Sequence, residues 1–112
     1  MWESRTNKRY DSVARVGIPG VLDGDVLLKN ISITGCCVEC PSSANISANS
    51  SYDIKIEPEN ESKIGDFVLP VECKWIQKGD NSKEIGFNIV NFPKGKLFQR
   101  YVDYLAYRSN IK

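Results

Sequence analysis

Residues 30–40 read NISITGCCVEC and directly follow a short apolar run that ends at Leu28. Asn30, Ser32 and Gly35 interrupt what would otherwise be a buried strand, because Asn and Ser side chains bond to nearby backbone and Gly adds chain entropy. Residues 36–40 then alternate between two thiols and a valine on one face and a thiol and a carboxylate on the other. We therefore expect two strands joined by a polar turn, which either only reverses the chain or also binds something.

Short alternating runs separated by turn residues continue on both sides of this stretch, which is typical of a small barrel or sandwich. The links between them are short and hairpin-like, so the strands favour antiparallel pairing in a closed or half-closed barrel. The six expected strands are 10–18, 25–32, 35–40, 52–57, 66–77 and 84–90.

The end of the chain follows a different period. Between residues 94 and 108 the apolar side chains recur at helical intervals. They are Leu97, Phe98, Tyr101, Val102, Leu105 and Ala106. The sequence therefore predicts an all-β fold, a six-stranded antiparallel β-barrel over residues 10–92, with one C-terminal α-helix across a mouth or a side of the barrel.

A chain of 112 residues is most simply one domain, 1–112, with enough buried surface for a single core. No apolar run approaches the ~20 residues that a membrane span needs. Residues 1–12 lack the apolar core of a signal peptide. We therefore expect a cytoplasmic protein that does not bind a membrane.

The net charge of +1 is distributed unevenly along the chain. Residues 1–15 carry four basic and two acidic side chains, residues 16–93 carry six and eleven, and residues 94–112 carry five and one. An acidic body with two basic ends is poorly suited to binding nucleic acid, which needs many phosphate contacts. It is compatible with a small anionic ligand held by N-terminal arginines, or with ends that only aid solubility.

Four cysteines, at positions 36, 37, 40 and 73, raise the alternatives of a zinc site and of a secreted, disulfide-bonded glycoprotein. Zinc ribbons use two paired C-x-x-C knuckles, whereas Cys73 stands alone and the chain has no histidine. Four N-x-[ST] sequences match the glycosylation signal, but no signal peptide accompanies them. We therefore expect buried free thiols and neither a metal nor a cofactor. The sequence contains no histidine, no G-x-S-x-G motif and no phosphate loop, so we expect no enzyme.

Two short motifs stand in a fixed order. Residues 5–9 read RTNKR, an R-x-x-x-R motif just before the first expected strand, and residues 30–35 read NISITG, a [D/N]-x-S-x-x-G motif. This combination resembles the PilZ domain, a receptor module for cyclic di-GMP. A Gly-Phe pair in the last expected strand (86–87), the six-stranded barrel and the C-terminal helix also match that family, so the resemblance covers essentially the whole chain.

The resemblance implies that Arg5 and Arg9, on a flexible arm formed by residues 1–9, clamp the ligand against the barrel surface that carries Asn30 and Ser32. An arginine can grip guanine O6 and N7 with its planar fork, stack on a base or pair with a phosphate. The side-chain oxygen of Asn30 can accept from guanine N–H groups, and the Ser32 hydroxyl can donate and accept. Gly35 permits either a positive-φ turn or a close approach of bare backbone to the ligand.

Other positions are further candidates for ligand contact. The alternation of residues 66–77 places Trp75 in the core, although some members of the family stack an aromatic on guanine at a comparable position. Two departures from the family pattern are Asn30, where many members carry Asp, and Ser4, where others carry a third arginine, which leaves open whether one ligand or two are bound. The remaining candidates near the arm are Asn7, Lys8 and Tyr10.

The sequence therefore predicts a stand-alone cyclic di-GMP receptor that orders its arm on binding, has no catalytic activity and signals through an unidentified partner protein. The first alternative is a PilZ-like adaptor between proteins that binds no nucleotide, although both motifs are present. The second is a small oligonucleotide-binding barrel, which would need exposed aromatics and a basic groove.

Overall fold

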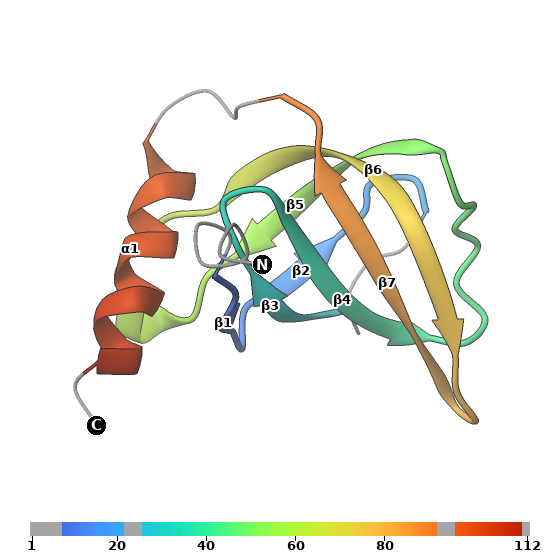
Figure 1. Cartoon of the computed structure of the whole chain (residues 1–112), viewed down its shortest axis with the longest axis horizontal. Helices are drawn as coiled ribbons and strands as arrows, with labels where there is room; N and C mark the ends of the chain where they lie inside the picture. The colour runs from blue at the N-terminus through green and yellow to red at the C-terminus, as the bar shows by residue number, and fades with distance from the viewer. Residues whose placement is uncertain (1–7, 22–25, 92–95, 111–112) are drawn as a thin grey trace.

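The computed structural model describes residues 8–21, 26–91 and 96–110, which form seven strands, one 3-10 helix and one α-helix (Figure 1). In chain order these elements are β1 (Tyr10–Asp11), β2 (Arg15–Gly17), β3 (Leu27–Ile31), β4 (Gly35–Pro41), β5 (Ser51–Glu57), η2 (Asn60–Ser62), β6 (Phe67–Lys78), β7 (Ser82–Ile89) and α1 (Leu97–Asn110). Arg5 and Asn7 of the predicted arm lie outside the described residues.

The strands form one antiparallel sheet that closes on itself. Its order is β1-β3-β2-β5-β6-β7-β4, and β3 also pairs with β4, so that β2 to β7 make a closed barrel. β1 is an extra, short strand that pairs with the end of β3. The predicted six-stranded antiparallel barrel with a C-terminal helix is confirmed.

The first predicted strand, 10–18, is divided into β1 and β2. The segment between them stays attached to β3, because the Ser12 N–H donates to the Lys29 carbonyl and the Leu28 N–H donates to the Ala14 carbonyl, each at 3.0 Å. The Ser12 hydroxyl accepts the N–H of Ala14 and also contacts Tyr101 of the helix. This bond from side chain to nearby backbone interrupts the strand, which alternation alone did not indicate.

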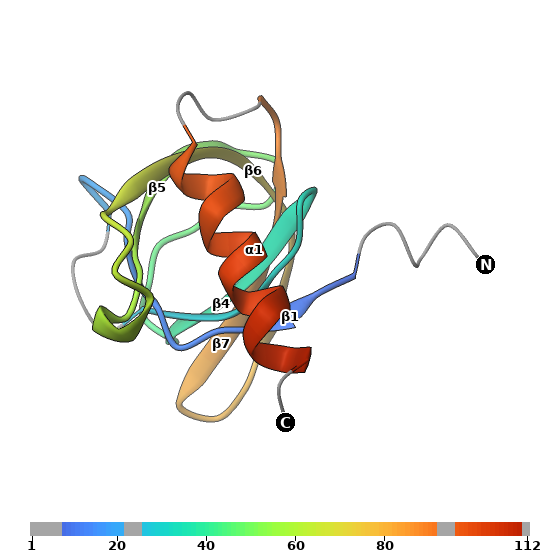
Figure 2. The same cartoon turned by 90° about the vertical axis from the view of Figure 1, so that its left-hand side faces the viewer.

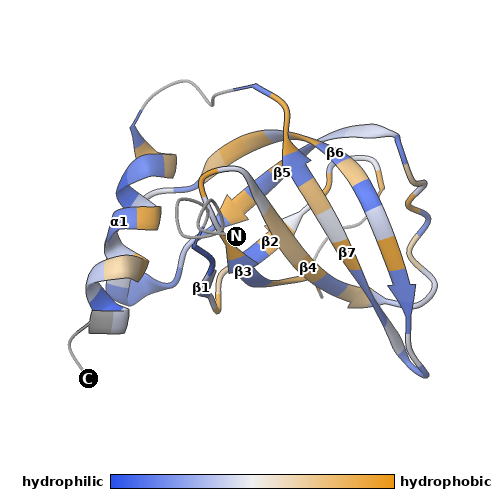
Figure 3. Ribbon diagram, in the orientation of Figure 1, coloured by the Kyte–Doolittle hydropathy of each residue, from blue (hydrophilic) through white to orange (hydrophobic). Residues whose placement is uncertain are grey.

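The barrel interior is filled by the inward-facing side chains of each strand. In β4, Cys36, Val38 and Cys40 are buried on the inner face, as predicted, and all four cysteines of the chain are free. Figure 3 shows hydrophobic and hydrophilic residues alternating along β6 and β7. The period-two pattern therefore identifies the core over most of the sheet.

The prediction that Trp75 belongs to the core is wrong. Cys73 pairs with Phe87 and Trp75 pairs with Gly86, so β6 moves on by two residues between these pairs while β7 moves on by one. Such a bulge reverses the faces of all later residues on the strand. Cys73 is fully buried, whereas Trp75 is 45% exposed and its indole lies against Gly86 on the outside of the barrel.

Helix α1 lies across one mouth of the barrel (Figure 2). Its apolar face, formed by Phe98, Tyr101, Val102 and Leu105, is buried. The rings of Phe98 and Tyr101 lie 6.2 and 6.0 Å from the ring of Phe67 at the start of β6. Among the described residues no helix is both long and apolar enough to cross a membrane.

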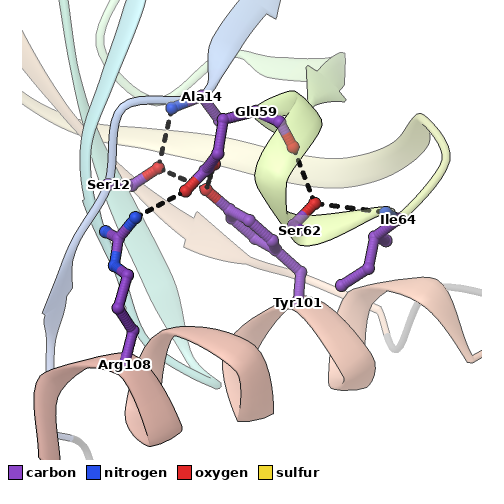
Figure 4. Close-up of polar contacts among 7 residues, drawn as sticks. All are labelled: Ser12, Ala14, Glu59, Ser62, Ile64, Tyr101 and Arg108. Atoms are coloured by element: carbon purple, nitrogen blue, oxygen red, sulfur yellow. Dashed lines mark hydrogen bonds and ion pairs between the residues drawn. The ribbon is translucent and has the colours of Figure 1, made fainter. Parts of the chain in front are cut away.

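A polar network fixes the helix to the barrel (Figure 4). The Tyr101 hydroxyl donates to Glu59 Oε1 at 2.7 Å and lies 2.7 Å from Ser12 Oγ, and Arg108 Nη1 donates to Glu59 Oε2 at 2.8 Å. Because a hydroxyl has one proton, Tyr101 donates to Glu59 and accepts from Ser12. Burial raises the pKa of the Tyr101 hydroxyl, which keeps it a donor at neutral pH. The network joins α1 to the loop before η2 and to the segment between β1 and β2.

We expect Tyr101→Phe to lower the free energy of unfolding by about 1–3 kcal/mol, because Ser12 and Glu59 lose a hydrogen-bond partner in a buried place. Urea denaturation followed by circular dichroism measures this loss. Tyr107→Phe is the matched control, since Tyr107 is 67% exposed on the same helix. Equal stability of the Tyr101 variant and the unmodified protein would contradict the role of the network.

Candidate ligand site

The two sequence motifs meet at one hydrogen bond. Arg9 Nη1 donates to Asn30 Oδ1 at 2.8 Å, across 21 positions of the chain. Backbone pairing places them there, because Asp11 of β1 pairs with Asn30 of β3. Beside them the Lys8 ammonium lies 5.5 Å from the centre of the Tyr10 ring. The predicted residues Lys8, Arg9, Tyr10 and Asn30 thus lie together at the root of the arm.

Ser32 has a different place in the structure. It is buried, and its hydroxyl accepts the N–H groups of Thr34 at 3.2 Å and Gly35 at 3.3 Å. Its own N–H donates to the Gly35 carbonyl at 2.8 Å, which closes the turn between β3 and β4. In this structure Ser32 shapes the turn that follows Asn30.

Gly35 allows β4 to approach β7 closely. A Cβ atom at this position would lie 2.5 Å from the carbonyl oxygen of Phe87. Gly35 is not among the described residues with a positive φ. The expected positive-φ turn at Gly35 is therefore not observed, and the close approach that the structure shows is to the backbone of β7. A close approach of Gly35 to a ligand stays a prediction.

A row of paired residues crosses the outer face of the barrel from the arm. Asn30 on β3 pairs with Cys37 on β4, Cys37 pairs with Gly86 on β7, and Gly86 pairs with Trp75 on β6. Neighbouring strands lie ~4.8 Å apart, so the path along the curved surface from Asn30 to Trp75 is roughly 14 Å, three strand spacings. Because the bulge turned Trp75 outward, its indole ring lies at the far end of a surface whose near end is Arg9 and Asn30.

The centre of this row is a thiol among charged side chains. Cys37 is only 7% exposed although it is on the outer face. Burial raises the pKa of its thiol, and Glu84 raises it further, whereas Lys29 and Arg9 oppose the shift. Lys29 and Glu84 form an ion pair beside it. On the inner face, burial raises the pKa of Cys36 to about 12, so these thiols are neutral at pH 7.

A groove runs between the root of the arm and the end of helix α1. It has a volume of about 580 Å³, and its walls include Lys8, Arg9 and Asp11 on one side and Leu105 and Arg108 on the other. This volume lies within the range of small-ligand sites. Sequence reasoning identified the arm side but missed Arg108 and Cys37. The sequence indicated Arg108 only through the basic C-terminal end, and Cys37 only through its outward position in the alternation.

The described part of the chain is thus a closed barrel with a helix over one mouth and with Lys8, Arg9 and Arg108 around the groove beside it. Among the described residues no group of three or more histidine, cysteine, aspartate or glutamate side chains could hold a metal ion.

The family model of the PilZ domain matches residues 3–106, and the chain therefore belongs to the PilZ domain family, a family of cyclic di-GMP receptor modules. No match was found among the curated proteins or among the solved structures.

We expect Gly35→Ala to cost about 1–3 kcal/mol of stability, because the added Cβ pushes β4 away from the Phe87 carbonyl. Gly17→Ala is the matched control, since a Cβ there would have no atom within 4 Å. Urea denaturation of both variants measures the difference. Equal losses in the two variants would show that the strand contact at Gly35 does not constrain the barrel.

Proposed function

We propose that this protein is a cyclic di-GMP receptor whose site is formed by the arm root and the outer face of the barrel. The observation that carries the proposal is the hydrogen bond of 2.8 Å between Arg9 and Asn30. It brings together, in the folded chain, two motifs that are separated in the sequence. Membership of the PilZ domain family supports the same ligand.

The chemistry of these two side chains suits guanine and phosphate. Arg9 uses one N–H group for Asn30, and a guanidinium has five donors. Within residues 8–21, 26–91 and 96–110 the Arg9 side chain has no other hydrogen bond, so its remaining donors can take guanine O6 and N7 or a phosphate oxygen. Asn30 Oδ1 is the acceptor that guanine N–H groups require once Arg9 moves to the ligand. Arg5 and Asn7, which lie outside the described residues, would add contacts from the arm.

The remaining predicted residues then have distinct roles. Ser32 and Gly35 hold the turn and the strand spacing that present Asn30, and Trp75 offers a flat aromatic surface for a base. The row from Asn30 to Trp75 spans roughly 14 Å, three strand spacings, which is room for a ligand with two purine bases. Ordering of the arm on binding would change the surface shown to a partner protein, and the PilZ module itself performs no chemistry.

Calorimetric titration with cyclic di-GMP tests the proposal. We expect a Kd of about 1 μM or tighter, and a loss of at least about tenfold in Arg9→Ala, because a charge-assisted contact is removed. Arg100→Ala is the matched control, since it removes an exposed arginine from α1 without touching the arm. Cyclic di-AMP should bind more weakly, because adenine lacks the O6 acceptor.

Binding of cyclic di-GMP with equal affinity by the unmodified protein and by Arg9→Ala would contradict the proposed site. An absence of binding in every protein would instead favour the adaptor that binds no nucleotide. Binding of single-stranded oligonucleotides with a steep salt dependence would favour the oligonucleotide-binding barrel.

A second prediction concerns Trp75. If its indole stacks on a guanine, Trp75→Ala weakens cyclic di-GMP binding by about tenfold, since base–aromatic stacking contributes ~1–3 kcal/mol. Val68→Ala is the control, because Val68 is a 51% exposed apolar residue on the same strand, outside the row. The same calorimetric titration measures both variants, and equal affinities would remove Trp75 from the site.

A further inference from the structure

The groove between the arm root and helix α1 carries an excess of positive charge. Lys8, Arg9 and Arg108 all lie on its walls, and Asp11 is the acidic residue among the described lining positions. Asp11 and the Glu59 partner of Arg108 offset part of this charge, and the positive charge that remains favours an anion in the groove. The body of the chain is otherwise acidic, with eleven acidic and six basic side chains in residues 16–93. The groove is thus a local exception to the charge of the barrel.

Arg108 is held in a defined position on the helix wall of this groove. Its Nη1 donates to Glu59 at 2.8 Å, and its guanidinium lies 5.5 Å from the centre of the Tyr104 ring. The Glu59 side chain is 9% exposed, whereas that of Arg108 is 40% exposed. Figure 4 shows the guanidinium reaching from α1 towards the barrel. Glu59 is the hydrogen-bond acceptor of Arg108 among the described residues, which leaves other N–H groups of the guanidinium for a second acceptor.

We propose that Arg108 is a further ligand residue, which binds a phosphate of cyclic di-GMP from the side of the groove opposite Lys8 and Arg9. This inference rests on the proposed function. A dinucleotide bound at the arm root would then direct one phosphate into the groove towards α1, while its bases lie over the outer face of the barrel. A role as counter-ion of Glu59 explains the ion pair, but it does not explain why Arg108 shares a groove with two other cations.

The consequence is a direct link from the ligand to the helix. Arg108 and Tyr101 both bond to Glu59, and Tyr101 bonds to Ser12, one residue after β1. A phosphate that draws on Arg108 competes with Glu59 for the same guanidinium. Binding would therefore alter the contact that fixes the end of α1 to the barrel, as well as the position of the arm.

Calorimetric titration of the full chain with cyclic di-GMP tests this role, with Arg108→Gln beside two controls. We expect Arg108→Gln to weaken binding by about tenfold, because a charge-assisted hydrogen bond to phosphate is lost. Arg100→Gln removes the same charge from the same helix and should bind as the unmodified protein does. Tyr101→Phe weakens the same network without removing a cation, so it should destabilise the fold and leave the affinity within about twofold.

The results separate the two proposals. Unchanged affinity in Arg108→Gln, with a large loss in Arg9→Ala, would overturn the role of Arg108 and leave the receptor standing. Equal losses in Arg108→Gln and Tyr101→Phe would also overturn it, because the effect would then come from a loosened helix. If the unmodified protein binds no cyclic di-GMP, both proposals fall.

Hydrogen exchange of the unmodified protein adds a measurement that does not depend on a variant folding. We expect saturating cyclic di-GMP to slow exchange in residues 97–110 more than in the hairpin between β6 and β7, which lies at the end of the barrel opposite α1 (Figure 1). Slower exchange confined to the arm root, with α1 unchanged, would overturn the contact between ligand and helix.

Discussion

The structure depends on the close backbone contact between Gly35 and Phe87. β4 has to lie between β3 and β7 for the barrel to close, and a Cβ at position 35 would lie 2.5 Å from the Phe87 carbonyl oxygen. The turn that leads into this contact is held by Ser32, whose hydroxyl takes two backbone N–H groups. The residues that close the barrel therefore also position Asn30, so the motif has a structural role beside the binding role that we propose for it.

Period-two alternation predicted the barrel because most of its strands have one buried and one outer face. The alternation gave the wrong assignment where a bulge or a hydrogen bond interrupted the regular strand. The bulge before Trp75 moves that residue from the inner to the outer face. No residue type near Trp75 indicates that β6 has one residue more than β7 at this point. In the same way, the Ser12 hydroxyl accepts the Ala14 N–H and interrupts the first strand, and its second bond, to Tyr101, joins residues 89 positions apart.

The site could be predicted in part for the same reason. Arg9 and Asn30 could be named because each belongs to a short motif that resembles the PilZ pattern, and the fold places Arg9 Nη1 2.8 Å from Asn30 Oδ1. Arg108 could not be found, because its place beside the arm depends on how α1 lies across the mouth. Trp75 could be predicted as a ligand residue only through the resemblance to the family. The bulge explains how its side chain reaches the outer surface.

The asparagine at position 30 affects how the arm is held before a ligand arrives. With an aspartate, Arg9 would form an ion pair, which is shorter and roughly twice as strong as a neutral hydrogen bond. An amide oxygen accepts from Arg9 without neutralising it, so the guanidinium keeps its charge for a phosphate. Arg108 is the contrasting case, since the carboxylate of Glu59 already neutralises part of its charge. The two arginines of the groove thus differ in how strongly their protein partners hold them. A dianionic ligand would therefore bind Arg9 more readily than Arg108.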